Sequence, residues 1–393
     1  MMKQNVFRRI GMAILATLLG SSGLTAQTSG QAPYLLPATT LNNGETGPVK
    51  IPAVMDSEVM QAGCASCNSF PPDFMPPRPG DDGCGGGCVA GGACKPCTSD
   101  SWCGRLYCCF YNALCCADPC YEPRWVAGAN AALFLDSTRP QGMTRVRWDS
   151  GRGMMFPDRN EYFWARAGGG GKGPKVVPNK LNYNDLSIYN EAGTERFSAF
   201  VVTPYRSYDG TPTGSGAGFG DVQLGTKSLL LDTEIVQISL QFTTFLPSAS
   251  PKTGAGVGHV SLEPALLMSV KLHEDTYLQT QIGEWIPLGG DPSVSGALLD
   301  YRVSLNHVLC RPWEESQLIG TLEFTGVSFQ DGAYTDPTTG LLVKSGGGNY
   351  FNLGPGVRWV ISRSCDFGFG TQFAVTKDHF ANQLYRTEMR FKF

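Results

Sequence analysis

The sequence has no apolar run long enough to cross a bilayer as a helix. The run at residues 10–19 falls short of the roughly 20 residues that a spanning helix needs, and no later stretch approaches that length. Only helices and closed barrels satisfy every backbone polar group in lipid. If this chain enters a membrane, it must therefore do so as a closed β-barrel.

Strong net charge and recognisable catalytic patterns are absent too. The 31 basic and 34 acidic residues leave a net charge of -3, which does not indicate nucleic-acid binding. No Gly-x-Ser-x-Gly elbow and no Walker-type loop occurs. We therefore expect no enzymatic activity and no cofactor. The histidines lie far apart, without metal-ligand spacing, at His259, His273, His307 and His379.

The N-terminus carries the features of an export signal. In residues 1–26 a basic start, an apolar run and a small-residue cleavage site follow one another, and no cysteine ends the run as in a lipoprotein. Residues 27–60 are rich in Pro, Gly, Thr and Asn without periodicity. This composition predicts a disordered exported tail.

Residues 61–120 hold 12 of the 14 cysteines between glycine and proline runs. Such a segment cannot build a sizeable core, so cross-links would have to hold it. We expect disulfides rather than a metal site, and spacing alone does not decide their pairing. Zinc at the Cys-x-x-Cys pairs and cross-links to other proteins are the alternatives. The candidate cysteines are Cys64, Cys67, Cys84, Cys88, Cys94, Cys97, Cys103, Cys108, Cys109, Cys115, Cys116 and Cys120.

The remaining chain has the alternating pattern of β-strands. In residues 121–157 the stretches 125–136 and 144–148 resemble short strands, which would link to the barrel or pack on or in it. Residues 158–393 predict an antiparallel up-and-down transmembrane barrel of about twelve strands (10–14), each close to the roughly 9–11 residues of a tilted membrane strand. The expected strands are residues 160–166, 181–189, 196–206, 220–231, 233–246, 258–272, 275–287, 298–310, 315–329, 349–362, 366–376 and 383–393.

The last strand shows the alternation most clearly. Its apolar face ends on an aromatic residue, as in the terminal strand that the barrel-assembly machinery of Gram-negative bacteria reads. The candidate assembly signal is Tyr385, Met389, Phe391 and Phe393. Its other face is charged, and earlier strands also place charge at mid-strand opposite an apolar face. The candidate lumen residues are Lys227, Glu263, Lys271, Arg302, Arg358, Arg386, Glu388, Arg390 and Lys392.

Connections between the expected strands alternate between short and long, the pattern of periplasmic turns and outer loops. A soluble sandwich also alternates along its strands, so this phase and the mid-strand charges favour the barrel. Cys310 and Cys365 stand beside short turns. We expect them to pair with each other or with the Cys-rich segment.

Four motifs resemble a planctomycete-type family of transporter-like outer-membrane β-barrels, related to the group named for the MetA pathway of phenol degradation. The motifs are PDRNEYFW at residues 157–164, GFGD at 218–221, SLEPALL at 261–267 and EWIPLGG at 284–290. The resemblance covers the chain from Asp158 to its end. It implies a barrel in the outer membrane, but it names no cargo and leaves out the Cys-rich segment.

Two functions follow from these features. The first is a passive outer-membrane channel or transporter for small solutes, whose predominantly arginine lumen favours anionic or polar solutes. The second is a structural envelope protein that is cross-linked to partners through its Cys-rich segment. With either function, we expect the protein to be exported to the outer membrane of a Gram-negative-type bacterium, with lipid and the barrel-assembly machinery as partners.

Overall fold

The structure is a computed structural model that describes residues 97–115, 126–155 and 163–393. The expected signal, the tail and most of the Cys-rich segment lie outside the described residues. Within the Cys-rich segment, α2 spans Trp102–Cys115, and Cys97 forms a disulfide with Cys108 across a Cα–Cα distance of 4.9 Å. Within the described ranges, no helix combines the length and the apolar character that a membrane crossing requires.

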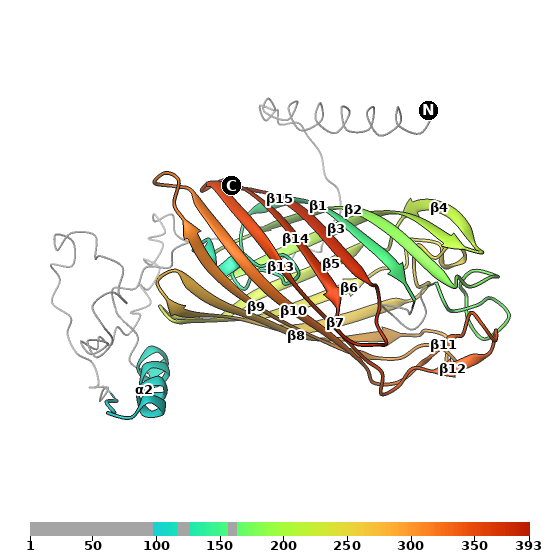
Figure 1. Ribbon diagram of the computed structural model, residues 1–393, viewed down its shortest axis with the longest axis horizontal. Coiled ribbons are helices and arrows are strands. Elements are labelled where there is room, and N and C mark those ends of the chain that lie inside the picture. The colour runs from blue at the N-terminus through green and yellow to red at the C-terminus, as the bar shows by residue number, and fades with distance from the viewer. Residues whose placement is uncertain (1–96, 116–125, 156–162) are drawn as a thin grey trace, which may run out of the picture. The chain divides into compact units, whose positions relative to one another are not determined.

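Twelve antiparallel strands form one closed barrel (Figure 1). Each strand pairs with its neighbour in the sequence, and β15 closes the ring by pairing with β1. The expected fold class is therefore confirmed. The barrel strands are β1 (Met143–Met154), β2 (Lys180–Gly193), β3 (Phe197–Thr211), β5 (Gln223–Asp232), β6 (Val236–Phe245), β7 (Val260–His273), β8 (Thr276–Leu288), β9 (Leu298–Cys310), β10 (Gln317–Phe329), β13 (Asn349–Ser362), β14 (Cys365–Ala374) and β15 (Gln383–Lys392).

The remaining short elements are not members of this ring of strands. β4 (Gly214–Phe219) pairs with the second half of β3, whereas β5 pairs with its first half, so β4 prolongs the path of β5. β11 (Ala333–Thr335) and β12 (Leu342–Lys344) form a hairpin. The 3-10 helices η2 (Gly128–Asn130) and η3 (Pro251–Thr253) complete the described elements.

The first barrel strand differs from the expected one. Residues 163–166 form a turn rather than a strand, and Phe163 and Trp164 are almost fully buried in it. The barrel begins instead with β1, which pairs with β15 from Met143 opposite Lys392 onward. Its boundary is thus Met143, not Asp158. The short strand expected at 125–136 is also wrong in its described residues, which contain η2 and irregular backbone.

Side chains alternate between the outside and the inside of the barrel. Outward residues of β14 such as Phe367, Phe369 and Phe373 are 41–43% exposed. Inward residues of the same barrel are polar and buried, for example Arg358 and Asp366, each 0% exposed. This is the reverse of a soluble protein, whose exposed surface carries the charge and whose interior is apolar.

The two ends of the barrel differ in their connections. Residues 194–196, 233–235, 274–275, 311–316 and 363–364 join strands at the short-turn end. Residues 155–179, 246–259, 289–297, 330–348 and 375–382 join strands at the long-loop end, on the side of β4, β11 and β12 in Figure 1. The stretch 207–219, between the strands expected at 196–206 and 220–231, is mostly the β3–β4 hairpin at this end.

Candidate functional site

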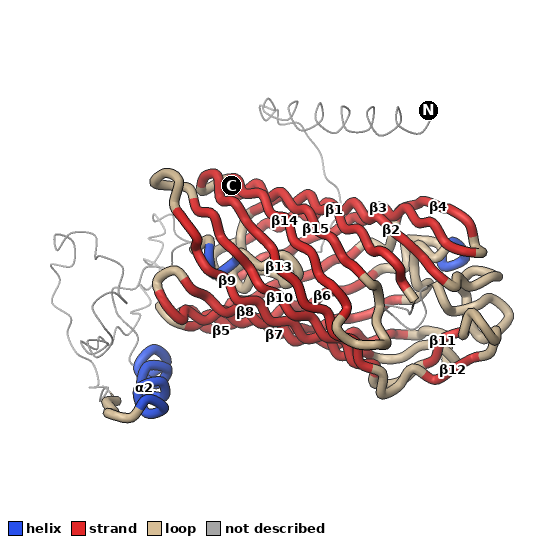
Figure 2. Tube along the Cα trace, in the orientation of Figure 1, coloured by secondary structure: helices blue, strands red, loops and turns tan. Residues whose placement is uncertain are grey.

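Residues 126–142, named here the inner segment, lie inside the barrel ahead of β1, where Figure 1 draws them in turquoise and Figure 2 as loop with one short helix. At the short-turn end, Ala127 and Ala131 form an apolar cluster with inward residues of β9, β10 and β13. The segment then reaches the middle of the barrel at Leu133 and returns to the same end. There Arg139 forms an ion pair with Asp232 at 3.4 Å. The inner segment therefore enters and leaves through the short-turn end.

Arginines of the barrel wall bind five successive carbonyl groups of the inner segment. Each bond is donated by a guanidinium group, and hydrogen bonds to charged groups are stronger than neutral ones. The donor and acceptor pairs are Arg390 with Asn130 (2.9 Å), Arg358 with Ala131 (2.8 Å) and Ala132 (3.1 Å), Arg386 with Leu133 (2.8 Å), and Arg302 with Phe134 (2.8 Å).

Carboxylate and amide groups of the wall accept the backbone N–H groups of the same stretch. The two carboxylate oxygens of Glu323 accept from Leu133 and from Phe134, each at 2.8 Å. Gln279 accepts from Ala132 and Gln281 accepts from Asp136, each at 3.0 Å. Side chains of the barrel thus satisfy backbone groups that a strand partner would otherwise bind.

Leu133 is seated on glycines of β13 and β14. A Cβ atom at Gly356, Gly368 or Gly370 would lie 2.6–2.7 Å from a Leu133 methyl carbon, closer than atoms can approach. The leucine is 0% exposed. Glycine at these inward positions therefore makes the space that the inner segment occupies.

A network of buried ion pairs surrounds this contact on β1, β13, β14 and β15. Arg358 lies 2.6 Å from Asp366 and 2.8 Å from Glu388, and Arg390 lies 2.7 Å from Asp366. Arg147 adds a bond to Glu388 at 2.9 Å. Since unpaired buried charges are strongly destabilising, this pairing is what allows so many charges to face the lumen.

The opposite wall, on β6 to β9, is mostly neutral and polar. Ser239 donates to the carbonyl of Thr138, and Ser269 donates to that of Ala129 at 3.1 Å. Buried amide and hydroxyl side chains line this wall, including Gln237, Gln241, Gln279, Gln281, Ser304 and Asn306. The inner segment therefore lies between a wall rich in charge and a wall rich in neutral polar groups.

The long-loop end is covered by the connection between β1 and β2. Trp164 accepts a backbone bond from Thr335 at 2.7 Å and donates its indole N–H to Pro178 at 3.0 Å. Phe163 packs against Tyr208 with ring centroids 5.0 Å apart. These two buried aromatic side chains close over the barrel mouth at this end.

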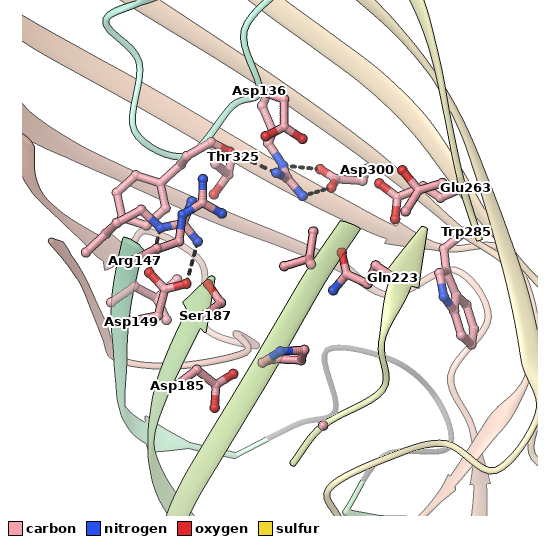
Figure 3. A pocket seen from close by; sticks show the side chains of 18 of the residues that line it. Asp136, Arg147, Asp149, Asp185, Ser187, Gln223, Glu263, Trp285, Asp300 and Thr325 are labelled. Atoms are coloured by element: carbon pink, nitrogen blue, oxygen red, sulfur yellow. Dashed lines mark hydrogen bonds and ion pairs between the residues drawn. The ribbon is translucent and has the colours of Figure 1, made fainter. Parts of the chain in front are cut away.

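A chamber of about 360 Å³ lies beside the inner segment, lined by Phe134 and Asp136 of that segment and by wall residues as far as Trp285 and Tyr350 near the long-loop end. Figure 3 shows Asp136, Arg147, Asp149, Glu263 and Asp300 around it. Charges on its wall are paired across short distances, as in Arg386 with Asp149 at 2.6 Å and Arg206 with Asp185 at 2.6 Å. Aromatic side chains lie among them, including Tyr183, Tyr189, Trp285, Tyr350 and Phe380. The chamber offers both ionic and aromatic surface to a small solute.

The structure places the nine candidate lumen residues as follows. Lys227, Arg358, Glu388 and Arg390 are buried, with 0–2% of each exposed. Lys227 lies 3.5 Å from Glu191 at the short-turn end, and Lys392 lies 2.6 Å from Asp366. Glu263, Arg302 and Arg386 line the chamber. Lys271 is half-buried near the end of β7.

The sequence reasoning offered packing in the barrel as one alternative for residues 121–157, but it missed what holds the inner segment there, above all its main acceptor, Glu323. Glu323 lies between the outward Leu322 and Phe324 on β10. A single charged residue between two outward apolar residues of a strand indicates a lumen-facing position, so the sequence did carry a signal for Glu323. The role of residues 126–142 left no such signal, because their partners lie far along the chain.

Metal and cysteine chemistry find little support in the described part of the chain. Among those residues no group of three or more His, Cys, Asp or Glu side chains could hold a metal ion. Cys310 and Cys365 are free thiols, so their expected pairing with each other is wrong. The Cys97–Cys108 disulfide joins two residues of one chain, whereas the other candidate cysteines lie mostly outside the described residues.

No protein-family model matches the sequence, and no curated protein matches it. Solved structures with a similar fold include the porin NanC, at 10% identity over 64% of this chain and 100% of that one, with a TM-score of 0.40. An outer membrane channel from Pseudomonas putida is 12% identical over 69% of this chain and 100% of that one, with a TM-score of 0.43.

The porin KdgM, solved in complex with disordered oligogalacturonate, is 8% identical over 64% of this chain and 99% of that one, with a TM-score of 0.34. Identities and TM-scores this low assign no cargo to this chain. They also leave the planctomycete-type family a prediction.

Proposed function

We propose that this chain is an outer-membrane β-barrel channel for the passive passage of small solutes, held closed by its inner segment. The observation that carries the proposal is the closed barrel with an apolar outside and a charged inside. A continuous exposed apolar surface of this extent in water would lead to aggregation, whereas lipid solvates it. The short-turn end then faces the periplasm and the long-loop end faces outward.

The inner segment supports a closed resting state. It fills the middle of the lumen and is held there by side chains on both walls. The segment contains one acidic and one basic residue, Asp136 and Arg139, and most of its other residues are apolar or small. It forms no strand pairing with the wall, so its departure would leave the ring of strands intact.

Replacing residues 127–141 with a short Gly-Ser linker tests the proposal. We expect ohmic conductance from the replaced barrel in planar bilayers, and rare or small openings from the intact chain. Retention of the folded barrel is checked by heat-modifiable mobility in gels. If the folded, replaced barrel leaves the bilayer sealed, the chain is not a channel.

The C-terminal strand supports targeting to the outer membrane. Met389 and Phe391 are each 36% exposed on the outside of β15, and Phe393 is 82% exposed beyond it. We propose that these residues and Tyr385 are read by the barrel-assembly machinery. Changing Phe393→Ala should lower the amount of folded barrel in outer-membrane fractions several-fold, with Lys377→Ala in an outer loop as the matched control. Equal amounts of both variants would contradict this role.

A further inference from the structure

The barrel wall beside Leu133 and Phe134 has the chemistry of a peptide-binding site. One carboxylate, Glu323, accepts two successive backbone N–H groups, and one guanidinium, Arg358, donates to two successive carbonyls. Both contacts read the peptide backbone rather than a side chain. A sugar or a simple carboxylic acid presents neither pattern of successive amide groups.

The chamber continues this wall toward the long-loop end. Arg302 and Arg386 donate to inner-segment carbonyls and also line the chamber, as does Gln281, which accepts the N–H of Asp136. A solute that enters the chamber therefore meets the same groups that hold the inner segment. The two ligands would share donors and acceptors at this boundary.

We propose that the ligands of this site are short peptides in the bent conformation of residues 130–134, with which they compete for it. The inference rests on the proposed channel function, because a peptide can compete for the site only if the inner segment can leave the lumen. Displacing the segment removes the backbone partners of Glu323 and Arg358, whose hydrogen bonds are charge-assisted and therefore among the stronger ones. A peptide restores those bonds and so stabilises the displaced state, whereas a solute without successive amides does not.

The neighbouring side chains define the preferred peptide. Ala131 lies in a tight apolar cluster, and Leu133 sits on the glycines of β13 and β14. The Phe134 ring lies 4.6 Å from the guanidinium carbon of Arg386, within the range of cation–π attraction. Two small residues, then leucine, then an aromatic residue therefore match the site.

Calorimetry on the detergent-solubilised full chain, with the peptide acetyl-Ala-Ala-Leu-Phe-amide as probe, tests the proposal. Because the inner segment competes for the site, its replacement by a Gly-Ser linker should raise the affinity at least about ten-fold. In the replaced barrel, the same peptide should also reduce the conductance from either side of the bilayer. Equal affinity in both proteins would place the peptide elsewhere and overturn the inference.

Backbone recognition has its own controls. A probe N-methylated at its Leu and Phe nitrogens cannot donate to Glu323, so we expect it to bind about ten-fold more weakly. Glu323→Gln should weaken the unmodified probe similarly and change the methylated one little. Asp275→Asn, which removes a carboxylate at a short turn outside the lumen, should leave both affinities unchanged. A methylated probe that binds as tightly as the parent would also overturn the inference.

The failure of this inference and that of the channel proposal are distinguishable. A replaced barrel that conducts but does not bind the probe rejects the peptide ligand alone, whereas one that binds it but stays sealed rejects the channel. If the replaced barrel does not fold, Leu133→Gly with Phe134→Gly in the full chain loosens the inner segment without altering the wall. The same rise in affinity is then expected, and its absence would reject the inference.

Discussion

At the scale of single residues, glycine and arginine on the inward face decide what the lumen contains. Gly356, Gly368 and Gly370 leave space for Leu133, and the guanidinium of Arg358 spans two carbonyls while it also contacts two carboxylates. Arg358 is therefore first a group that holds the inner segment. A charge reversal there would face Glu388 and Asp366, so it would disturb folding as well as selectivity.

The close contact between Gly368 and Leu133 predicts that enlarging residue 368 loosens the inner segment and that shrinking residue 133 compensates. Gly368→Ala places a carbon 2.6 Å from a Leu133 methyl group, which should loosen the inner segment at a cost of about 1–3 kcal/mol. Adding Leu133→Ala should restore much of the closed state, because the smaller side chain relieves the clash. Single-channel open probability measures both effects. Gly218→Ala, where a Cβ atom meets open space, is the matched control.

The two single changes should be non-additive, since their side chains are in contact. Each variant is compared by its increase in open probability over the unchanged chain. If the increase in the double variant equals or exceeds the sum of the two single increases, this contact does not hold the segment.

At the scale of elements, β1 and the inner segment together explain where the barrel begins. β15 needs β1 as its partner, and the resemblance from Asp158 onward leaves this strand out. The sequence identified residues 144–148 as a short strand but could not place it. Its inward side chains Arg145, Arg147 and Asp149 are charged, and their partners are supplied by distant strands and by the inner segment.

A disulfide between the inner segment and β14 should lock the channel. The Cβ position at Gly370 lies 3.6 Å from the Cβ of Leu133, within the usual disulfide range of roughly 3.5–4.5 Å. Leu133→Cys with Gly370→Cys should abolish openings under oxidising conditions, and reductant should restore them. Each single variant controls for the native cysteines.

A reductant response of equal size in the single variants would assign the effect to the native cysteines. If the double variant is oxidised, by mass, and still opens as often as the single variants, movement of the inner segment is not the gate.

At the scale of the whole molecule, the distribution of inward charge is uneven. On β1, β13, β14 and β15 six basic residues face three carboxylates, namely Arg145, Arg147, Arg358, Arg386, Arg390 and Lys392 against Asp149, Asp366 and Glu388. The wall of β6 to β9 carries fewer inward charges, and Arg302 there is paired with Asp300. Asp136 of the inner segment lies 3.2 Å from Arg145 and so offsets part of the positive charge of this wall.

Removing the inner segment should therefore expose a wall with excess positive charge. We expect the barrel with residues 127–141 replaced to prefer anions, measured as the reversal potential in a salt gradient. Arg386→Gln in that background should reduce the preference, since this side chain lines the chamber. Because exposed charges are screened, the preference should fall as salt rises.

Lys344→Gln in the β11–β12 hairpin is the control for general loss of positive charge. A cation preference in the replaced barrel, or an equal effect of the two substitutions, would contradict a selectivity set by this wall.

The sequence by itself determined the fold class, the closing strand and the two faces of the barrel. Those properties depend on the local alternation of side chains, which a strand of a given length carries wherever it packs. Only the tertiary structure decided that the lumen is filled, that its charges are paired and that β1 completes the ring. The contacts responsible join distant residues, such as Leu133 and Glu323, which are 190 positions apart. No local pattern encodes such a contact, because it exists only after the strands have closed around the inner segment.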